Sequence, residues 1–491
     1  MRSLLVLFLL WLFLPLLVAG QAQTRIAIRA GRLIDGRSDK VLENVLIQVE
    51  GDKIISVIAG GSAPANVQVV DLSKATVLPG FIDTHTHLLL HGDTTQEECD
   101  AQLLKESIPY RAILAARNAQ IALLHGFTAI RDLETEGAMY ADVDVKTAIA
   151  NGEVPGPRLQ VATRAMTPTG IYPLFHYSWE LRLPTGVRYA DGAEGVRRAV
   201  REQKMYGADW IKYYSDRRVH FDADSRLRSE VLFTDEEAKA IVEEAHRLGT
   251  KVAAHAIGSE GIAAALRAGV DTIEHGDGLT DAQMNEMVRR GVYWVPTVTV
   301  DRNLAAGSTD EFWKKTVDLQ RENFAKARQK GVKTALSTDA GGFDWKRVNQ
   351  AKEFEYYVEY GMTPMQAIRT GTSVAAELLG WSEAAGTVEG GKWADLVAVR
   401  GDPLRDIREL QNVKFVMKAG IIFKNELTDE MSGRGVSCAT IRPETDYSFR
   451  EPGSERFLGL FLFSSAISSC PEAGTATAPL RTMSSASIFF P

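Results

Sequence analysis

Eight short apolar stretches alternate with helix-like stretches through the middle of the chain, and this alternation limits the possible folds more than any other feature. A typical helix-like segment runs from Asp235 to Leu248, with Thr234 as a potential N-cap and Gly249 behind it. The strand candidates are residues 81–87, 127–132, 158–163, 209–214, 251–255, 270–275, 292–297 and 333–339. Eight strand–helix units favour a (β/α)8 barrel. The alternative is an open doubly wound sheet, but no glycine-rich phosphate fingerprint follows a first strand.

Two regions of short β pattern bracket this central body. We expect residues 23–79 and 386–427 to form one small β-sandwich from both ends of the chain, with the barrel spanning residues 80–385. Residues 428–491 are rich in Ser, Pro, Thr and Ala and lack periodicity, so we expect a disordered tail and assign it no function.

The first residues have the pattern of a targeting segment. Arg2 provides a positive n-region, Leu4 to Val18 form an apolar run, and small residues follow it. We therefore predict a signal peptide at residues 1–22 and a secreted or periplasmic mature protein. An uncleaved anchor is the alternative, but the run is short for a membrane span, so we expect no stable span after cleavage.

The bulk composition excludes one class of partner. The net charge is -7, and no Lys/Arg-rich run is present, which argues against nucleic-acid binding. Hydrophobic residues make up 45% and charged residues 24%, as in an ordinary globular protein. We expect a small-molecule or dipeptide-like substrate and a homo-oligomer.

A His-x-His pair ends the first predicted barrel strand. Alternate side chains of a strand share a face, so His85 and His87 would project together, with Cα atoms about 6.6 to 7 Å apart. Both imidazoles could then bind one ion. Taken alone, the pair could equally be two ordinary half-buried histidines.

Other polar residues recur at equivalent strand ends. Lys212 lies near the end of the fourth strand, His255 and His275 end the fifth and sixth, and Asp339 ends the eighth. In a (β/α)8 barrel these ends meet at one rim, where active sites are built, so the residues should converge. The alternative is that a neighbour satisfies each of them separately.

Lysine is an unexpected neighbour for a metal ion because its cation would repel it. A desolvated, neutral Lys212 could instead react with carbon dioxide and form an anionic carbamate that bridges two ions. The alternative is a salt bridge between Lys212 and Asp339. Nitrogen and oxygen ligands without cysteine suit zinc with open coordination positions.

These motifs resemble those of the amidohydrolase superfamily, and more narrowly its imidazolonepropionase-like, Xaa-Pro dipeptidase (prolidase) and ochratoxin amidase branch. The resemblance rests on Pro79-Gly80-Phe81-Ile82-Asp83-Thr84-His85-Thr86-His87, Lys212, His255-Ala256, Ile273-Glu274-His275-Gly276 and Ser337-Thr338-Asp339-Ala340-Gly341. It implies two Zn²⁺ per subunit, one bound by His85, His87 and Asp339 and one by His255 and His275, bridged by N6-carboxylysine at Lys212. A metal-bridging hydroxide would attack the amide, and Asp339 would carry the proton to the leaving amine.

The resemblance also suggests substrate residues. A tyrosine beside the lysine contacts the substrate in related dipeptidases; we favour Tyr213 over Tyr214, and an ordinary strand aromatic is the alternative. Related enzymes often carry Thr-Gly-Gly-His after the third strand, whereas this chain has Thr167-Pro168-Thr169-Gly170. We therefore expect His176, from a longer loop that also holds Tyr172, to polarise the carbonyl. Arg217 and Arg218 could bind a substrate carboxylate, although solvated loop arginines are common.

The resulting hypothesis is a secreted binuclear zinc amidohydrolase that cleaves N-acyl or N-aroyl amino acids and dipeptides, with ochratoxin A as one candidate. One alternative is a mononuclear deaminase or cyclic-amide hydrolase of the same superfamily, which would generally lack the bridging lysine. A catalytically silent scaffold is the other, but it would be expected to have lost ligands.

Overall fold

The computed structural model describes residues 25–92, 95–170, 177–178 and 180–427. The predicted signal peptide at residues 1–22, the tail at residues 428–491, and the candidate site residues Tyr172 and His176 lie outside this part.

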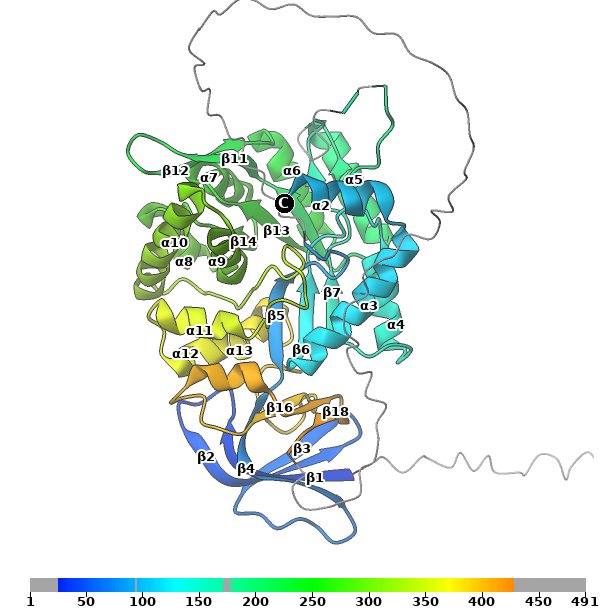
Figure 1. The fold of residues 1–491 in the computed structure, drawn as a ribbon, viewed down its shortest axis with the longest axis vertical. Helices are drawn as coiled ribbons and strands as arrows, with labels where there is room; N and C mark the ends of the chain where they lie inside the picture. Colours follow the sequence, from blue (N-terminus) through cyan, green and yellow to red (C-terminus); the bar gives the residue numbers. More distant parts are fainter. Residues whose placement is uncertain (1–24, 93–94, 171–176, 179, 428–491) are drawn as a thin grey trace, which may run out of the picture. The chain divides into compact units, whose positions relative to one another are not determined.

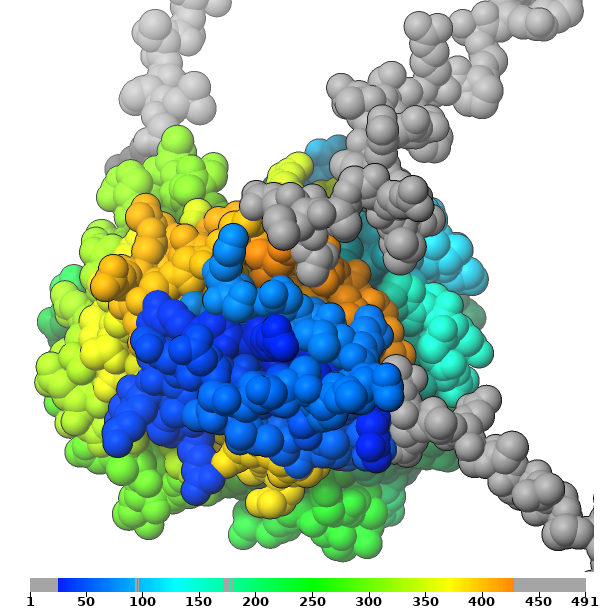
Figure 2. All heavy atoms as spheres, turned by 90° about the horizontal axis from the view of Figure 1, so that it is seen from below, coloured from blue at the N-terminus to red at the C-terminus, as the bar shows by residue number. Residues whose placement is uncertain are grey.

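Strands from both ends of the chain form one seven-stranded sheet (Figure 1). Its order is β18 (Ile421–Asn425), β17 (Phe415–Lys418), β16 (Leu396–Val399), β4 (Gln68–Pro79), β1 (Arg25–Ile34), β2 (Val41–Glu50) and β3 (Lys53–Ala59). Figure 2 shows the N-terminal strands (blue) beside residues of the C-terminal part (orange), as the antiparallel pairing of β4 with β16 requires. Side chains of β1, β2, β4, β16 and β17 share their own apolar core. Both ends of the chain thus contribute to one small β region; where a sandwich was expected, the structure pairs its strands in a single seven-stranded sheet.

The chain passes from this sheet into the barrel at a Pro79-Gly80 break. The Gly80 amide donates to the Asp395 carbonyl (2.9 Å), and the adjacent strand β5 (Phe81–Thr86) begins at once. A second connection is made by Arg158, whose guanidinium lies 3.9 Å from the ring centre of Trp393 and 3.3 Å from an Asp395 oxygen. A stacked and paired arginine of this kind fixes the base of the barrel against the sheet.

The central body has the strand order of a (β/α)8 barrel. One parallel sheet contains β5, β6 (Phe127–Asp132) and β7 (Arg158–Val161); the other runs β15 (Tyr293–Val295), β14 (Thr272–His275), β13 (Lys251–Ala256), β10 (Trp210–Tyr214), β8 (Met166–Thr167) and β9 (Arg188–Tyr189). The eighth segment, residues 333–340, lies between β15 and β5. Its Ala335 amide donates to Trp294 (3.0 Å), and its Leu336 carbonyl accepts from Thr84 (2.9 Å). The segment predicted as the eighth strand is not a continuous strand: it pairs through two isolated bridges, Trp294 with Thr334 and Thr86 with Ala340, and so connects the first strand with the seventh.

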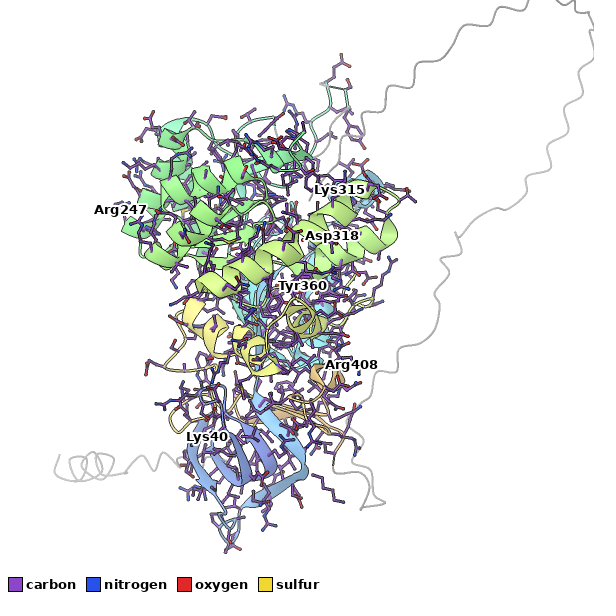
Figure 3. The ribbon with its side chains drawn as sticks, turned by 90° about the vertical axis from the view of Figure 1, so that its left-hand side faces the viewer. Lys40, Arg247, Lys315, Asp318, Tyr360 and Arg408 are labelled. Atoms are coloured by element: carbon purple, nitrogen blue, oxygen red, sulfur yellow. The ribbon has the colours of Figure 1, made fainter. Side chains whose placement is uncertain are left out.

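Helices follow the strands along the chain and pack their apolar faces outside them. They are α2 (Gln96–Asp100), the π-helix η1 (Ala101–Lys105), α3 (Ile108–Leu124), α4 (Ala141–Ala150), α5 (Gly192–Met205), α6 (Asp235–Arg247), α7 (Ser259–Ala268), α8 (Asp281–Arg290), α9 (Val298–Gly307), α10 (Glu311–Lys330), α11 (Lys352–Glu359), α12 (Pro364–Thr370), α13 (Ser373–Leu378) and the 3-10 helix η2 (Ile407–Asn412). Thr234 and Glu237 form the capping box of α6, as its sequence predicted. Figure 3 shows Lys315 and Asp318 on α10, where both are exposed. None of the described helices is both long and apolar enough to cross a membrane.

A hairpin after β10 was not anticipated. It consists of β11 (Asp216–Phe221) paired antiparallel with β12 (Leu227–Val231). Its sequence, with Arg217, Arg218, Arg226 and Arg228, lacks the apolar alternation of a half-buried strand, so the region was interpreted as a loop. The hairpin stands at the carboxyl end of the fourth barrel strand, which places its first residues beside the rim.

Candidate metal centre

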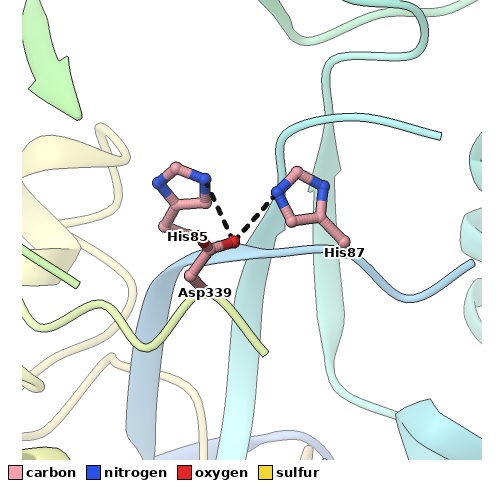
Figure 4. A group of neighbouring side chains, drawn as sticks. All are labelled: His85, His87 and Asp339. Carbon is pink, nitrogen blue, oxygen red and sulfur yellow. Dashed lines mark ion pairs between the residues drawn. The ribbon is translucent and has the colours of Figure 1, made fainter. Parts of the chain in front are cut away.

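Three side chains lie close enough together to bind one ion (Figure 4). The Nε2 atoms of His85 and His87 lie 3.6 and 3.1 Å from Oδ1 of Asp339. Two ligands bound tetrahedrally at about 2.1 Å would lie about 3.4 Å apart, so these spacings fit a metal such as zinc. All three residues are buried, which would shield a bound ion from competing water.

Lys212, His255 and His275 line the same cavity, together with Tyr214 and Glu136. The ring centres of His85 and His275 are 5.1 Å apart, and those of His255 and His275 are 4.6 Å apart. The Nε2 atoms of His85 and His255 are buried without a hydrogen-bond partner in the described part of the chain. Buried polar atoms are normally satisfied, so these two lone nitrogen atoms indicate ligand positions for metal.

The backbone at two of these residues is strained. His275 has φ 67° and Asp339 has φ 56°, a left-handed conformation that is uncommon outside glycine. Each such residue costs of order 1–3 kcal/mol, and strain of this kind gathers at active sites. The next turn requires Gly341 (φ 116°), because a Cβ there would lie 2.3 Å from the His87 carbonyl oxygen. The end of the eighth strand is thus pressed against the end of the first.

Burial disfavours the charged form of three residues in the metal cavity. Burial lowers the pKa of Lys212, and it lowers the pKa of His275 to about 4 and that of His255 well below its usual value. Neutral imidazole is the form of histidine that binds metal. Neutral amine is the form of lysine that reacts with carbon dioxide. Burial also disfavours charge on Asp339, but the neighbouring histidines outweigh this and lower its pKa. The ion pairs found for Asp339 in the described chain are with His85 and His87 rather than with Lys212.

A buried network behind the ligands orients them. Glu274 accepts from Nδ1 of His85 (2.8 Å) and from the Arg131 guanidinium (2.9 Å), and none of these three side chains is exposed. Nδ1 of His275 contacts the Thr297 hydroxyl at 2.9 Å. Such partners fix the ring orientation and direct the other nitrogen, Nε2, toward a metal. Glu274 and Arg131 were not singled out from the sequence, although Glu274 stands directly opposite His255 in the register of β13 and β14.

Replacing Glu274 with glutamine should weaken the site and the fold together. Glutamine offers one acceptor oxygen in place of two and carries no negative charge, so it holds His85 and Arg131 less firmly, and we expect metal affinity to fall about 10- to 100-fold. Leaving the buried Arg131 cation without its counter-charge should cost about 3–5 kcal/mol of unfolding free energy. Competition with a chelator and urea denaturation measure the two effects. Glu286→Gln, which removes an exposed pair with Arg289, is the control; equal effects from both variants would contradict the orienting role.

The two tyrosines of β10 face opposite sides. Lys212 and Tyr214 line the metal cavity, whereas the Tyr213 ring packs on Phe233 in the core of the helix layer, with centres 5.9 Å apart. The placement does not support the substrate contact predicted for Tyr213. Strand alternation explains it, because the residue that shares a face with Lys212 is two positions on. This signal was present in the sequence.

The two candidate arginines are also separated. The Arg217 guanidinium lies 4.8 Å from the Tyr214 ring centre, and Arg217 is 9% exposed. Arg218 is exposed and pairs with Glu230 at 3.1 Å across the hairpin. Of the two arginines, Arg217 is therefore the one that contacts a residue of the metal cavity.

Two buried carboxyl groups after β6 lie beside Tyr214. The Tyr214 hydroxyl lies 2.6 Å from Glu134 and 3.3 Å from Glu136. Burial raises the pKa of both carboxyl groups, and their mutual repulsion raises that of Glu134 further. The sequence offered no periodic signal for these residues, since they follow the strand in a connecting segment.

Comparisons with known proteins identify the family to which this chain belongs. Residues 76–422 match the family model described as the Amidohydrolase family. Ochratoxinase from Aspergillus niger is 31% identical over 445 residues, covering 84% of this chain and 89% of that protein. A Xaa-Pro dipeptidase crystallised with methionine in its active site is 34% identical, with a TM-score of 0.73 over 82% of this chain and 100% of the other. The crystal structure of A. niger ochratoxinase superposes with a TM-score of 0.69 at 28% identity, over 82% and 96% of the two chains.

Proposed function

Since this chain belongs to the amidohydrolase family, we propose that it is a secreted binuclear zinc enzyme that cleaves N-acyl or N-aroyl amino acids and dipeptides. The chain is a hydrolase of C–N bonds, as are its ochratoxinase and prolidase relatives. The observation that carries the finer proposal is the convergence of four histidines, one lysine and one aspartate on one buried cavity, with two imidazole nitrogens unsatisfied in the described chain.

The donor set fits two ions. His85, His87 and Asp339 would hold one, His255 and His275 the other, and a carboxylated Lys212 would lie between them. The carbamate forms when the neutral lysine nitrogen bonds to the carbon of carbon dioxide and loses a proton. Bound zinc would acidify water and polarise the scissile carbonyl.

The protein's own groups then handle protons and substrate. Asp339, whose lowered pKa keeps it ionised, is placed to accept the proton of the attacking water and pass it to the leaving nitrogen. Tyr214 extends from the face of β10 that carries Lys212 and is held by Glu134. Arg217, stacked on Tyr214, offers a cation to the carboxylate of the released amino acid.

Zinc stoichiometry combined with a substrate screen tests the proposal. The purified protein should contain two zinc ions per chain and should hydrolyse members of a panel of N-acyl amino acids, Xaa-Pro dipeptides and ochratoxin A. One ion per chain with release of ammonia from a cyclic or aromatic amine would instead identify a mononuclear deaminase. Failure to hydrolyse any amide while holding two zinc ions would refute the substrate class.

Arg217→Ala should selectively weaken substrates that carry a free carboxylate. Losing a hydrogen bond to a charged group costs about 1.5–3 kcal/mol, so we expect kcat/KM to fall about 10- to 150-fold for an N-acyl amino acid and little for its amide. Arg218→Ala, on the exposed side of the same hairpin, is the matched control. A similar loss for the acid and for the amide would show that Arg217 supports the hairpin rather than the carboxylate.

Export is the remaining part of the proposal. It is supported by Arg2, the apolar run from Leu4 to Val18 and the small residues after it. Expression in the native host, followed by fractionation and N-terminal sequencing, should find a processed protein outside the cytoplasm that begins near residue 23. An unprocessed protein in the cytoplasm would refute it.

A further inference from the structure

A cavity of about 670 Å³ lies at the base of the barrel. Its walls are the last turn of α4, the loop from α4 into β7, the two tryptophans Trp381 and Trp393, and the turn from β17 into β18. Arg158, the first residue of β7, lines it, whereas the candidate metal ligands stand at the carboxyl ends of the barrel strands, at the opposite rim. We call this cavity the base pocket, and it is separate from the metal cavity.

Most of the lining of the base pocket is apolar. Ile149 and Leu159 are buried in its wall, and Phe423 lines it from β18. The rings of Trp381 and Trp393, both half-buried, meet edge to face with centres 5.7 Å apart. The volume lies within the range of about 300–1,000 Å³ that is typical of small-molecule sites. The base pocket therefore offers an apolar surface of the size that an organic molecule needs.

The charges that line the base pocket are all positive in the part of the chain that the structure describes. They belong to Lys146, Arg158 and Lys418, and no aspartate or glutamate is among the described lining residues. Lys146 pairs with Asp209 at 2.6 Å, and Arg158 pairs with Asp395 at 3.3 Å. Two of the three cations thus have a counter-charge, and Lys418 differs from them.

Lys418 is a half-buried cation without a counter-charge. Its ammonium donates to the Gly156 carbonyl, and no carboxylate of the described residues forms an ion pair with it. The nearby Asp395 is already engaged, because it accepts from the Ala419 amide (2.7 Å) as well as from Arg158. Burial lowers the pKa of Lys418 to about 8, so most of the amine still carries its proton at neutral pH. A desolvated cation of this kind is stabilised by an anion that comes to it.

We propose that the base pocket is a second binding site, for a medium-sized apolar carboxylate whose body lies against Trp381 and Trp393 and whose carboxylate pairs with Lys418. A cationic occupant would meet three like charges. An uncharged apolar molecule would leave Lys418 without a partner, and a small inorganic anion would leave the apolar walls in water. The site uses none of the candidate metal ligands, so it does not depend on the proposed amide hydrolysis.

The test measures the binding of decanoate to the full-length protein by calorimetry, with decyltrimethylammonium as a probe of opposite charge that should bind far more weakly. Lys418→Met keeps the apolar bulk of the side chain and removes the cation, so decanoate affinity should fall about 10- to 100-fold, the scale of a hydrogen bond to a charged group. Lys424→Met is the matched control: Lys424 lies on the adjacent strand β18, pairs with Glu426 at 3.6 Å and does not line the pocket. It should bind decanoate like the wild type.

A second variant keeps the proposal testable if Lys418→Met does not fold. Ile421 lines the base pocket, stands opposite Lys418 in the pairing of β17 with β18 and is 61% exposed. Ile421→Glu therefore places a like charge beside the ligand at a surface position, and decanoate affinity should fall about tenfold or more.

Three results would overturn the proposal. Decanoate that fails to bind the wild type would remove the site. Equal decanoate affinity in the wild type and the folded variants would place the anion elsewhere, for instance in the metal cavity. An oligomer that Ile421→Glu dissociates, in a protein that does not bind decanoate, would show that a second copy of the chain covers the base pocket instead.

Discussion

Replacing Lys212 with alanine is expected to abolish amide hydrolysis and to reduce the zinc content from two ions per chain to one or fewer. The buried amine lines the same cavity as the four histidines, and burial lowers its pKa, so Lys212 is the residue that would bridge the two ions of the proposed site. Losing a metal that supplies several kcal/mol of transition-state stabilisation corresponds to a rate loss of about 10³-fold or more. Metal analysis of dialysed protein and kcat/KM on the best amide measure both effects.

Two further variants distinguish loss of the bridge from loss of the fold. Lys212→Met keeps the apolar bulk of the side chain and should behave like the alanine variant in metal content while unfolding at a similar temperature. Lys251→Ala removes a partly buried lysine at the start of the next strand, where its Nζ donates to the Leu378 carbonyl (2.6 Å), and should keep both ions.

A short carboxylic acid such as propionate should partly restore activity to Lys212→Ala. Two zinc ions and full activity in that variant would exclude the binuclear site.

Asp339→Asn should retain most of the metal and lose about 10²- to 10⁴-fold in rate. The amide oxygen can still serve as a weak ligand beside His87, whose Nε2 lies 3.1 Å from the Asp339 carboxylate. Asparagine cannot accept a proton, so the transfer from water to the leaving nitrogen loses its carrier, and general acid–base groups contribute on this scale. Steady-state kinetics on metal-quantified protein is the measurement.

Substrates with different leaving groups distinguish proton transfer by Asp339 from metal binding by Asp339. A substrate with an activated leaving group, such as an acyl p-nitroanilide, needs less proton donation, so Asp339→Asn should be impaired less on it than on an alkyl amide. An equal loss on both substrates would assign Asp339 to metal binding alone. An unchanged rate on both would remove the residue from the reaction.

The convergence of the candidate metal ligands could be predicted because each stands at the end of an apolar strand. In a (β/α)8 barrel these ends meet, so spacing along the chain is enough to bring His85, Lys212, His255, His275 and Asp339 to one rim. The orienting residues could not be found in this way. Glu274 and Arg131 meet across the barrel interior, at a sequence separation of 143 residues, and no local pattern marks a pair that forms only when distant strands pack.

The assignment of Tyr213 illustrates a different kind of failure. Tyr213 is adjacent to Lys212 in the sequence, but the strand directs Tyr213 into the helix layer and Tyr214 toward the metal cavity. The period of two that groups His85 with His87 also groups Lys212 with Tyr214. The information was local, because strand alternation alone indicates that Tyr214 is the tyrosine on the same face as Lys212.

The sequence by itself determined the barrel class, the use of both chain ends in the added β layer, and the residue types available for metal, because these depend on periodicity and on chemistry carried by single residues. Only the tertiary structure decided how the site works around that donor set. The left-handed turns at His275 and Asp339, the Glu274–Arg131 pair and the hairpin that places Arg217 on the Tyr214 ring all involve contacts between distant segments. Such contacts depend on how the strands pack around one interior, which local sequence patterns do not encode.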